Sequence, residues 1–339
     1  MARDWILLRL NNYPIDLRIG HQALSLGLTE EVNKLLGETN RFTELAAAQL
    51  NFRIARLNNE PNPYDKLLTK TIKEQVSKII NKALVLSKPI NVAINGGIGD
   101  HLEALSLIIP WAESNQVAVN IHIDQQRNAQ LSAILRNCFC INIEGTNGIP
   151  VLALRGWIKG NSDENYGSWI KSNSKSIASN KLVCCWKAEG SGDKFSAYCR
   201  SVPFDIVCKF YELILSKRDY AIQDISNWNR WESAKLSSLG VKLLNPSAGN
   251  LLDLARVVEK NEVITIDTAL AHLCAAMGRR AIVLLPMFAD ERWIELCNQG
   301  SSYATNLTLL RNQMFGNWRP CIGTLSQILL SRDGNFVAN

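Results

Sequence analysis

The sequence has few of the residues from which metal sites and disulfide frameworks are built. Only four of its 339 residues are histidines, and no two are spaced as H-x-x-x-H. Its nine cysteines are odd in number, contain no C-x-x-C pair, and stand partly inside apolar runs. Metal hydrolases, zinc modules and disulfide-stapled secreted domains are therefore poor candidates. We expect reduced, buried thiols, no metal, and a cytoplasmic location.

Long apolar runs and blocks of like charge are also missing. The N-terminal stretch MARDWILLRLNN has too short an apolar run for a signal peptide or a transmembrane helix. The formal net charge of +6 is mild and is not concentrated in a Lys/Arg block. This charge fits a basic site for phosphates and a weak peripheral contact with an anionic membrane. It does not call for a nucleic-acid partner.

The composition is that of a soluble globular protein, with 47% hydrophobic and 20% charged residues, and the length suits two domains. Residues 1–87 predict amphipathic helices, either degraded tetratricopeptide units or a plain helical cap, since no 34-residue repeat is visible. After residue 88 strands alternate with helices, which favours α/β units with parallel sheets. We predict a helical segment over 1–87, one α/β domain over 88–180 and a second over 181–339.

Three local predictions bear on the site. The apolar run 151–154 predicts a short strand, and the polar stretch 156–180 predicts a mobile crossing between the domains. Residues 189–201 predict a loop.

One stretch, VITIDTALAHLCAAMG at 263–278, combines a β-branched strand with a helix of small residues. Asp267 and Thr268 lie between them, and both residue types cap helix N-termini. The start of such a helix, beyond the carboxyl end of a parallel strand, is a favoured phosphate site. The alternative is that Asp267 only caps the helix and His272 only packs.

A second stretch, NGGIGDHLEAL at 95–105, is a glycine-rich turn between a strand and a helix. Glycines allow close backbone approach to a ligand. Asp100 at the helix start repels phosphate but can accept a proton from a hydroxyl. The turn lacks the third glycine of a dinucleotide-binding fingerprint, which disfavours a nicotinamide oxidoreductase.

These stretches and three others resemble, in the same order, segments of the heptosyltransferases and of the tetratricopeptide-linked glycosyltransferase-like family. The others are CCWKAEGSGDKFSAYCRSVPF, YAIQDI and ADERWIELCNQGSSYATNLTLLRNQMFGNW. Together the five cover about residues 92–330. The resemblance implies a GT-B fold, in which two Rossmann-like domains face a cleft. It also implies an enzyme that moves a sugar from a nucleotide-diphosphate donor to an acceptor hydroxyl with inversion and without a metal or cofactor.

The same resemblance implies roles for individual residues. Asp100 matches the general base, and Arg200 matches the basic residue that holds the donor diphosphate. The remaining donor-binding positions that it implies are Gly97, Gly99, Trp186, Gln223, Asp267, Thr268, Ala269 and His272. Asp290, Arg292 and Trp293 match a motif to which we assign no role. The acceptor could be a glycan, a lipid-linked sugar or a protein.

Each role has a structural alternative. Asp100 could be a helix cap, Arg200 a surface ion-pair residue, and His272 a packed histidine. The tryptophans are more typical of a core than of stacking platforms; Trp228 and Trp231 are the two to test against a nucleotide base. A scaffold that has lost turnover and a nucleotide-sugar epimerase are the other functions compatible with the fold.

Overall fold

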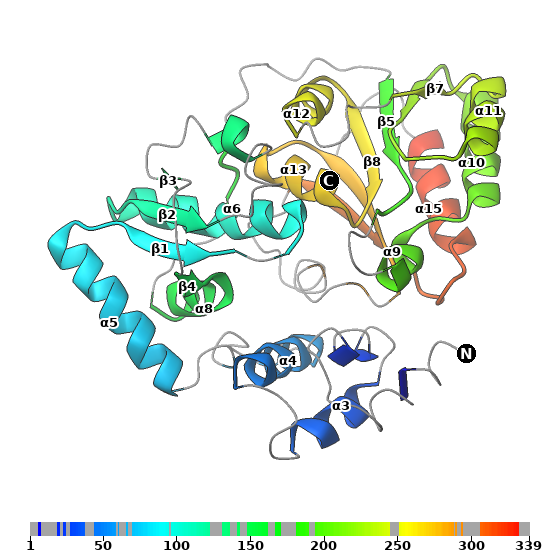
Figure 1. Cartoon of the computed structure of the whole chain (residues 1–339). Coiled ribbons are helices and arrows are strands. Elements are labelled where there is room, and N and C mark those ends of the chain that lie inside the picture. The colour runs from blue at the N-terminus through cyan, green and yellow to red at the C-terminus, as the bar shows by residue number, and fades with distance from the viewer. Residues whose placement is uncertain are drawn as a thin grey trace.

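The computed structural model describes residues 6–7, 19–20, 23–24, 28–37, 44–58, 60, 66, 70–94, 96–122, 131–135, 141–142, 148–161, 167–170, 181–189, 194–244, 251–287, 289, 293 and 306–331. Two parallel sheets lie side by side with helices around them, and the N-terminal helices α3 (Thr29–Leu36) and α4 (Glu44–Leu57) lie below (Figure 1). The α/β class with parallel sheets is therefore confirmed.

The first sheet has the strand order β3-β2-β1-β4, and every pairing is parallel. Its strands are β1 (Ile90–Ala93), β2 (Val119–His122), β3 (Ile141–Asn142) and β4 (Ile149–Pro150). The helix α6 (Ile98–Ser114) connects β1 to β2, and α8 (Val151–Asn161) follows β4. The order is that of a Rossmann sheet cut after its fourth strand, with the reversal of strand order between β1 and β4.

The second sheet is a complete six-stranded Rossmann sheet. Its order β10-β9-β8-β5-β6-β7 is parallel throughout and reads sixth, fifth, fourth, first, second and third along the chain. The strands are β5 (Lys181–Cys185), β6 (Ala221–Asp224), β7 (Lys242–Leu243), β8 (Glu262–Ile266), β9 (Ala281–Leu285) and β10 (Leu307–Arg311). The helices are α9 (Lys194–Arg200), α10 (Phe204–Lys217), α11 (Arg230–Ser238), α12 (Leu251–Lys260), α13 (Ala269–Ala276) and α15 (Arg319–Leu330).

The alternation of side chains along β5 shows how both faces of this sheet are buried. Leu182, Cys184 and Trp186 pack into one hydrophobic cluster with α10 and α15. Val183 and Cys185 point the other way, into the cluster that also contains the core of the first sheet. A strand buried on both faces reads as a continuous apolar run, which is why the sequence marked this element clearly.

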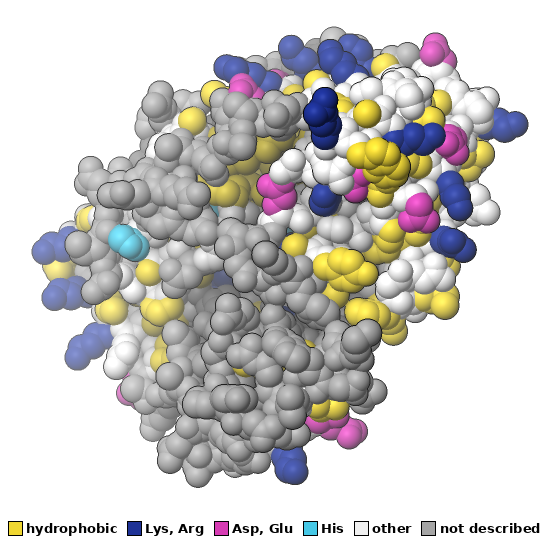
Figure 2. Space-filling view, turned by 45° about the vertical axis from the view of Figure 1, so that its right-hand side comes forward, with side chains coloured by type: hydrophobic (Ala, Val, Ile, Leu, Met, Phe, Trp, Pro, Cys, Tyr) yellow, Lys and Arg dark blue, Asp and Glu magenta, His cyan; other side chains and the backbone are white. Residues whose placement is uncertain are grey.

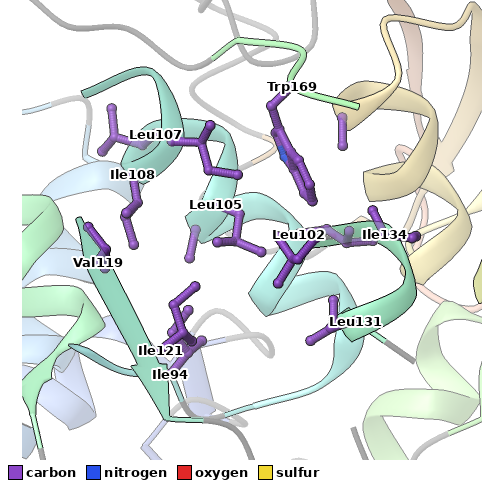
Figure 3. Packing of buried hydrophobic residues seen from close by; sticks show 14 of the residues in the cluster. Ile94, Leu102, Leu105, Leu107, Ile108, Val119, Ile121, Leu131, Ile134 and Trp169 are labelled. Atoms are coloured by element: carbon purple, nitrogen blue, oxygen red, sulfur yellow. The ribbon is translucent and has the colours of Figure 1, made fainter. Parts of the chain in front are cut away.

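The helix α6 joins the two cores. Figure 3 shows Ile108 near Val119 of β2 and Leu102 beside Leu131 and Ile134, and α6 also packs directly against α13. The buried cluster therefore runs from the first sheet through both helices to the second sheet without interruption.

Two segments differ from the sequence-based prediction. The run 151–154, expected as a strand, is the first turn of α8, because Leu154 and Ile158 recur at helical spacing and both are fully buried. The stretch 189–201, expected as a loop, contains α9, whose Ala197 packs into the core of the second sheet. Part of the expected mobile crossing 156–180 is likewise helical, up to Asn161.

The helix α5 (Lys70–Leu86) falls within the predicted N-terminal helical segment but packs on the first sheet. Val76, Ile80 and Ala83 belong to the same cluster as β1, and Ser77 Oγ accepts a 2.9 Å bond from the indole N–H of Trp157. Buried apolar residues of α3 and α4, together with described residues before them, form a separate cluster.

Candidate functional site

Both glycine- and aspartate-bearing stretches follow strands that border a reversal of strand order. β1 leads into Gly96, Gly97 and α6, and β8 leads into Asp267, Thr268 and α13. In open α/β sheets this is the edge at which ligands bind. The strand–turn–helix placement that the sequence predicted for both stretches is confirmed.

The N-terminus of α6 is capped by a side chain of the helix itself. Asp100 Oδ2 accepts a 2.6 Å hydrogen bond from the Gly97 N–H, and His101 Nδ1 lies 2.8 Å from the Gly97 carbonyl oxygen. Gly96 has a φ of +115°, and a Cβ there would collide with the Asp100 carboxylate. Asp100 is thus a helix cap, as its structural alternative predicted. A carboxylate has about four lone-pair sites, so the cap does not use all of its acceptor capacity.

The start of α13 is built differently. Thr268 takes the N-cap position with an extended backbone, but its side chain makes no capping bond. The hydroxyl lies 3.1 Å from that of Thr265 in β8 instead. Ala269 is the first residue of the helix, and Gly278, with a φ of +62°, follows its end. The Thr268 side chain therefore does not cap α13, although the Ala271 N–H donates to the Thr268 carbonyl oxygen at 3.0 Å. A helix start of this kind is where an anion would be stabilised.

Arg200 lies at this same helix start. Its Nη1 donates a 2.8 Å hydrogen bond to the Asp267 carbonyl oxygen and is 3.8 Å from Asp267 Oδ2. The Arg200 side chain is 26% exposed and that of Asp267 is 10% exposed, so the pair is partly shielded from water. α9, the helix that the sequence did not reveal, brings Arg200 to this position at its last residue.

His272 connects the two helix starts. It is 3% exposed, and its Nε2 lies 3.8 Å from Asp267 Oδ1. The centroids of the His272 and Trp293 rings are 4.8 Å apart. A Cβ built on Gly99 would lie 2.6 Å from His272 Cδ2. Only a glycine at position 99 allows this approach. The two stretches, 170 residues apart in the chain, are therefore in direct contact.

Two predicted donor-binding residues lie elsewhere in the second sheet. The Trp186 side chain is fully buried, and its indole N–H donates a 2.5 Å bond to the Tyr211 hydroxyl. Its ring is therefore part of the core, as the structural alternative for the tryptophans predicted, and does not reach a surface pocket. Gln223 is half-buried on β6, beside Val183 of β5. Asp290 and Arg292 lie outside the described residues.

A buried ion pair next to the site escaped the sequence analysis. Arg155 Nη2 of α8 lies 2.8 Å from Glu103 Oε1, and Nη1 bonds Oε2 at 3.3 Å. Glu103 is one turn along α6 from Asp100, so this pair ties the helix that carries Asp100 to α8. The signal was Glu103 itself, a charge in the otherwise apolar helix HLEALSLIIPWA.

Asp224 is a second residue that the sequence analysis missed. It is fully buried at the end of β6 and accepts 2.7 Å bonds from the Tyr211 hydroxyl and the Ser226 N–H. Burial raises the pKa of its carboxyl above the usual range, and these bonds act in the opposite direction. This network fixes the loop after β6 and holds no position at either helix start.

The described residues contain no group of three or more His, Cys, Asp and Glu side chains that could hold a metal ion. Among the helices that the structure describes, none is long and apolar enough to span a membrane. What the arrangement offers is a carboxylate at one helix start and, at the other, the Arg200–Asp267 pair beside a helix that the Thr268 side chain does not cap. Such a pairing suits removal of a proton on one side and stabilisation of an anion on the other.

No protein-family model and no curated protein sequence matches the chain. Solved structures that are similar to it include three glycosyltransferases. E. coli ADP-heptose LPS heptosyltransferase II shares 10% identity over 71% of this chain and 99% of its own, with a TM-score of 0.44. E. coli heptosyltransferase WaaC with ADP-2-deoxy-2-fluoro heptose shares 12% over 70% and 98%, with a TM-score of 0.42. The glycosyltransferase TibC of enterotoxigenic E. coli shares 11% over 58% and 57%, with a TM-score of 0.40. All three TM-scores are below 0.5, so the fold described above is argued from the strand order of this chain.

Proposed function

We propose that this chain is a glycosyltransferase that moves a sugar from a nucleotide-diphosphate donor to an acceptor hydroxyl. The observation that carries the proposal is the contact between Gly99 and His272. It brings the carboxylate-bearing start of α6 against the anion-favouring start of α13, each beside the reversal point of a Rossmann-type sheet.

The chemistry follows from these two helix starts. Asp100 acts as general base and takes the proton of the acceptor hydroxyl as the oxygen attacks the anomeric carbon. Arg200 and the N-terminal amides of α13 stabilise the negative charge of the departing diphosphate. With the charge handled in this way, no metal is required, and direct attack inverts the anomeric centre.

The remaining assignments are part of the same proposal. Gly97, Thr268, Ala269 and His272 line the approach of the donor sugar and phosphates, and the enzyme acts in the cytoplasm. The six cysteines that the structure describes are all free thiols, which suits a reducing compartment. Which sugar, which base and which acceptor it uses are left to experiment.

A second candidate is a nucleotide-sugar-binding scaffold without turnover. Specific contacts favour it: Asp100 already accepts a bond from Gly97, and Arg200 is already bound to the Asp267 carbonyl oxygen. Donor binding would have to compete with the second of these contacts.

The test is a panel of nucleotide sugars measured in two ways. Thermal shift reports binding, because a ligand that binds only the folded chain raises its stability. Release of nucleoside diphosphate, with and without acceptor sugars, reports turnover. Binding with turnover supports the enzyme, binding without turnover favours the scaffold, and no binding by any donor contradicts both.

A further inference from the structure

The helix α5 has a buried face and an exposed face of unusual composition. Val76, Ile80 and Ala83 pack on the first sheet. Outside this buried stripe three large apolar side chains are exposed: Val85, which faces away from it, is 81% exposed, and Ile79 and Leu86, which border it, are 48% and 50% exposed. Ile79 and Leu86 are seven residues apart, which places them on one stripe two turns long.

Lysines surround these apolar side chains. Lys78 and Lys82 are exposed one turn apart, and Lys82 falls between Ile79 and Leu86 on the same stripe. Lys73 and Lys88 are exposed towards the two ends, and Glu74 is the single acid in the helix sequence. The exposed face therefore combines apolar contact area with net positive charge.

This combination identifies the kind of surface that it fits. Protein–protein interface cores are depleted in lysine, and a nucleic-acid backbone offers no partner to Ile79, Val85 and Leu86. An anionic bilayer can bind both the apolar side chains and the lysines. The apolar side chains enter the acyl boundary while the lysines reach the headgroup phosphates. α5 lies at the left margin of the molecule in Figure 1, and Figure 2 shows Lys and Arg side chains with hydrophobic ones along that edge.

We propose that the outer face of α5 docks the protein on a bilayer of anionic phospholipids, with Ile79, Val85 and Leu86 inserted and the lysines bound to headgroups. This proposal does not depend on the proposed transferase activity. It accounts for the apolar side chains that α5 leaves exposed.

The experiment is co-sedimentation of the full chain with vesicles of phosphatidylcholine alone and of equimolar phosphatidylcholine and phosphatidylserine. We expect binding to the anionic vesicles only, with loss in high salt. The variant Lys78→Gln/Lys82→Gln/Lys88→Gln should lower the partition coefficient about 100-fold, since each basic residue near the surface contributes about a factor of five. The variant Val85→Ser/Leu86→Ser should lower it about tenfold.

The second sheet provides a matched control on α10. Lys209, Leu213 and Lys217 are also exposed there. Lys209→Gln/Lys217→Gln and Leu213→Ser should leave vesicle binding within twofold. All substituted positions are exposed, and circular dichroism confirms that each variant is folded.

Three results would overturn the proposal. One is that the protein co-sediments equally with neutral and anionic vesicles, or that it co-sediments with neither kind. Another is an equal loss from the α5 and α10 variants, which would make binding a matter of overall charge. The third is a fall in sedimentation mass of the α5 variants without vesicles, which would assign the face to self-association.

Discussion

The starts of α6 and α13 both lie beside the reversal of strand order in their sheets, α6 after the first strand and α13 after the fourth, and their N-termini are capped differently. At α6 a carboxylate three residues into the helix bonds back to the Gly97 N–H. At α13 the N-cap threonine makes no capping bond, and a guanidinium lies beside the preceding carbonyl group. Both starts carry a carboxylate, but that of Asp267 at α13 lies 3.8 Å from the Arg200 guanidinium, whereas that of Asp100 at α6 accepts a bond from a backbone N–H.

This difference shows how two Rossmann-type sheets in one chain can present different charges at their ligand-binding edges. A helix dipole alone would make both starts attractive to phosphate. The Asp100 carboxylate opposes that attraction at α6, whereas at α13 the Arg200 guanidinium lies beside the Asp267 carboxylate and offsets its charge. The proposed function accordingly places the donor phosphates at α13 and the hydroxyl to be deprotonated at α6.

The sharpest way to break the comparison is Asp100→Asn. Asparagine keeps an oxygen that can accept the Gly97 N–H bond but cannot take a proton at neutral pH. We expect turnover to fall about 100- to 10,000-fold, the usual contribution of a general base, with nucleotide affinity and melting temperature little changed.

Asp100→Ala is the matched control, because it removes the cap as well as the base. It should lose about 0.5–2 kcal/mol of stability in addition to activity. If Asp100→Asn keeps full turnover, Asp100 is a cap alone and the division of roles between the helices is wrong.

A second test acts on the anchoring of α6. Arg155→Met leaves Glu103 buried without its partner, and we expect a loss of about 3–5 kcal/mol of unfolding free energy in urea titrations. The double variant Glu103→Leu/Arg155→Met removes both charges and should recover most of that loss. A single variant as stable as the parent would show that the pair does not hold the helix.

On the other side of the comparison, Arg200→Ala should weaken nucleoside-diphosphate binding by about 2–3 kcal/mol, or roughly 30- to 150-fold. Isothermal titration calorimetry measures this change in nucleoside-diphosphate affinity. Arg200→Lys should restore part of the affinity, since it returns the charge without the planar fork.

Arg256 offers a control for the loss of one arginine. Its 2.9 Å pair with Asp253 is largely exposed, so Arg256→Ala should leave affinity unchanged. Equal effects of the two alanine variants would mean that general charge, and not the position of Arg200, determines binding.

The mildest change tests the contact between the helices. Gly99→Ala places a methyl group 2.6 Å from His272 Cδ2 and should cost about 1–3 kcal/mol of stability. Gly323→Ala in α15, where no atom lies within 4 Å of the added carbon, should be neutral or stabilising. Adding His272→Ala to Gly99→Ala should relieve the strain, and additive losses would contradict the contact.

The sequence predicted the parts of the fold that local chemistry determines. The β-branched strand before Asp267, the small-residue helix and the glycine after it all lie where their pattern placed them. The glycine turn also lies where its pattern placed it, directly after β1. The pairing of the two stretches followed from their order in the chain and from the resemblance, and the roles of the site residues remain predictions.

What the sequence did not reveal depends on tertiary contacts. Four apolar residues at 151–154 suit a strand or a helix equally, and the choice is made by burial of Leu154 and by the partner of Arg155. α9 has only seven residues and follows the polar, glycine-containing stretch EGSGD, so the sequence predicted a loop there, although this helix positions Arg200. The partners of Trp186 lie 25 and 40 residues away, so its place in the core could not be read locally.

The short segment 167–170 has a mechanical consequence. The amides of Trp169 and Ile170 both donate to the Ala276 carbonyl oxygen, and the Trp169 indole donates to Ser106, which fastens the far end of α13 to α6. The two helices are therefore held together at both ends, through Trp169 at the end of α13 and through Gly99 against His272 at its start. A relative rotation of α6 and α13 would have to break one of these two contacts.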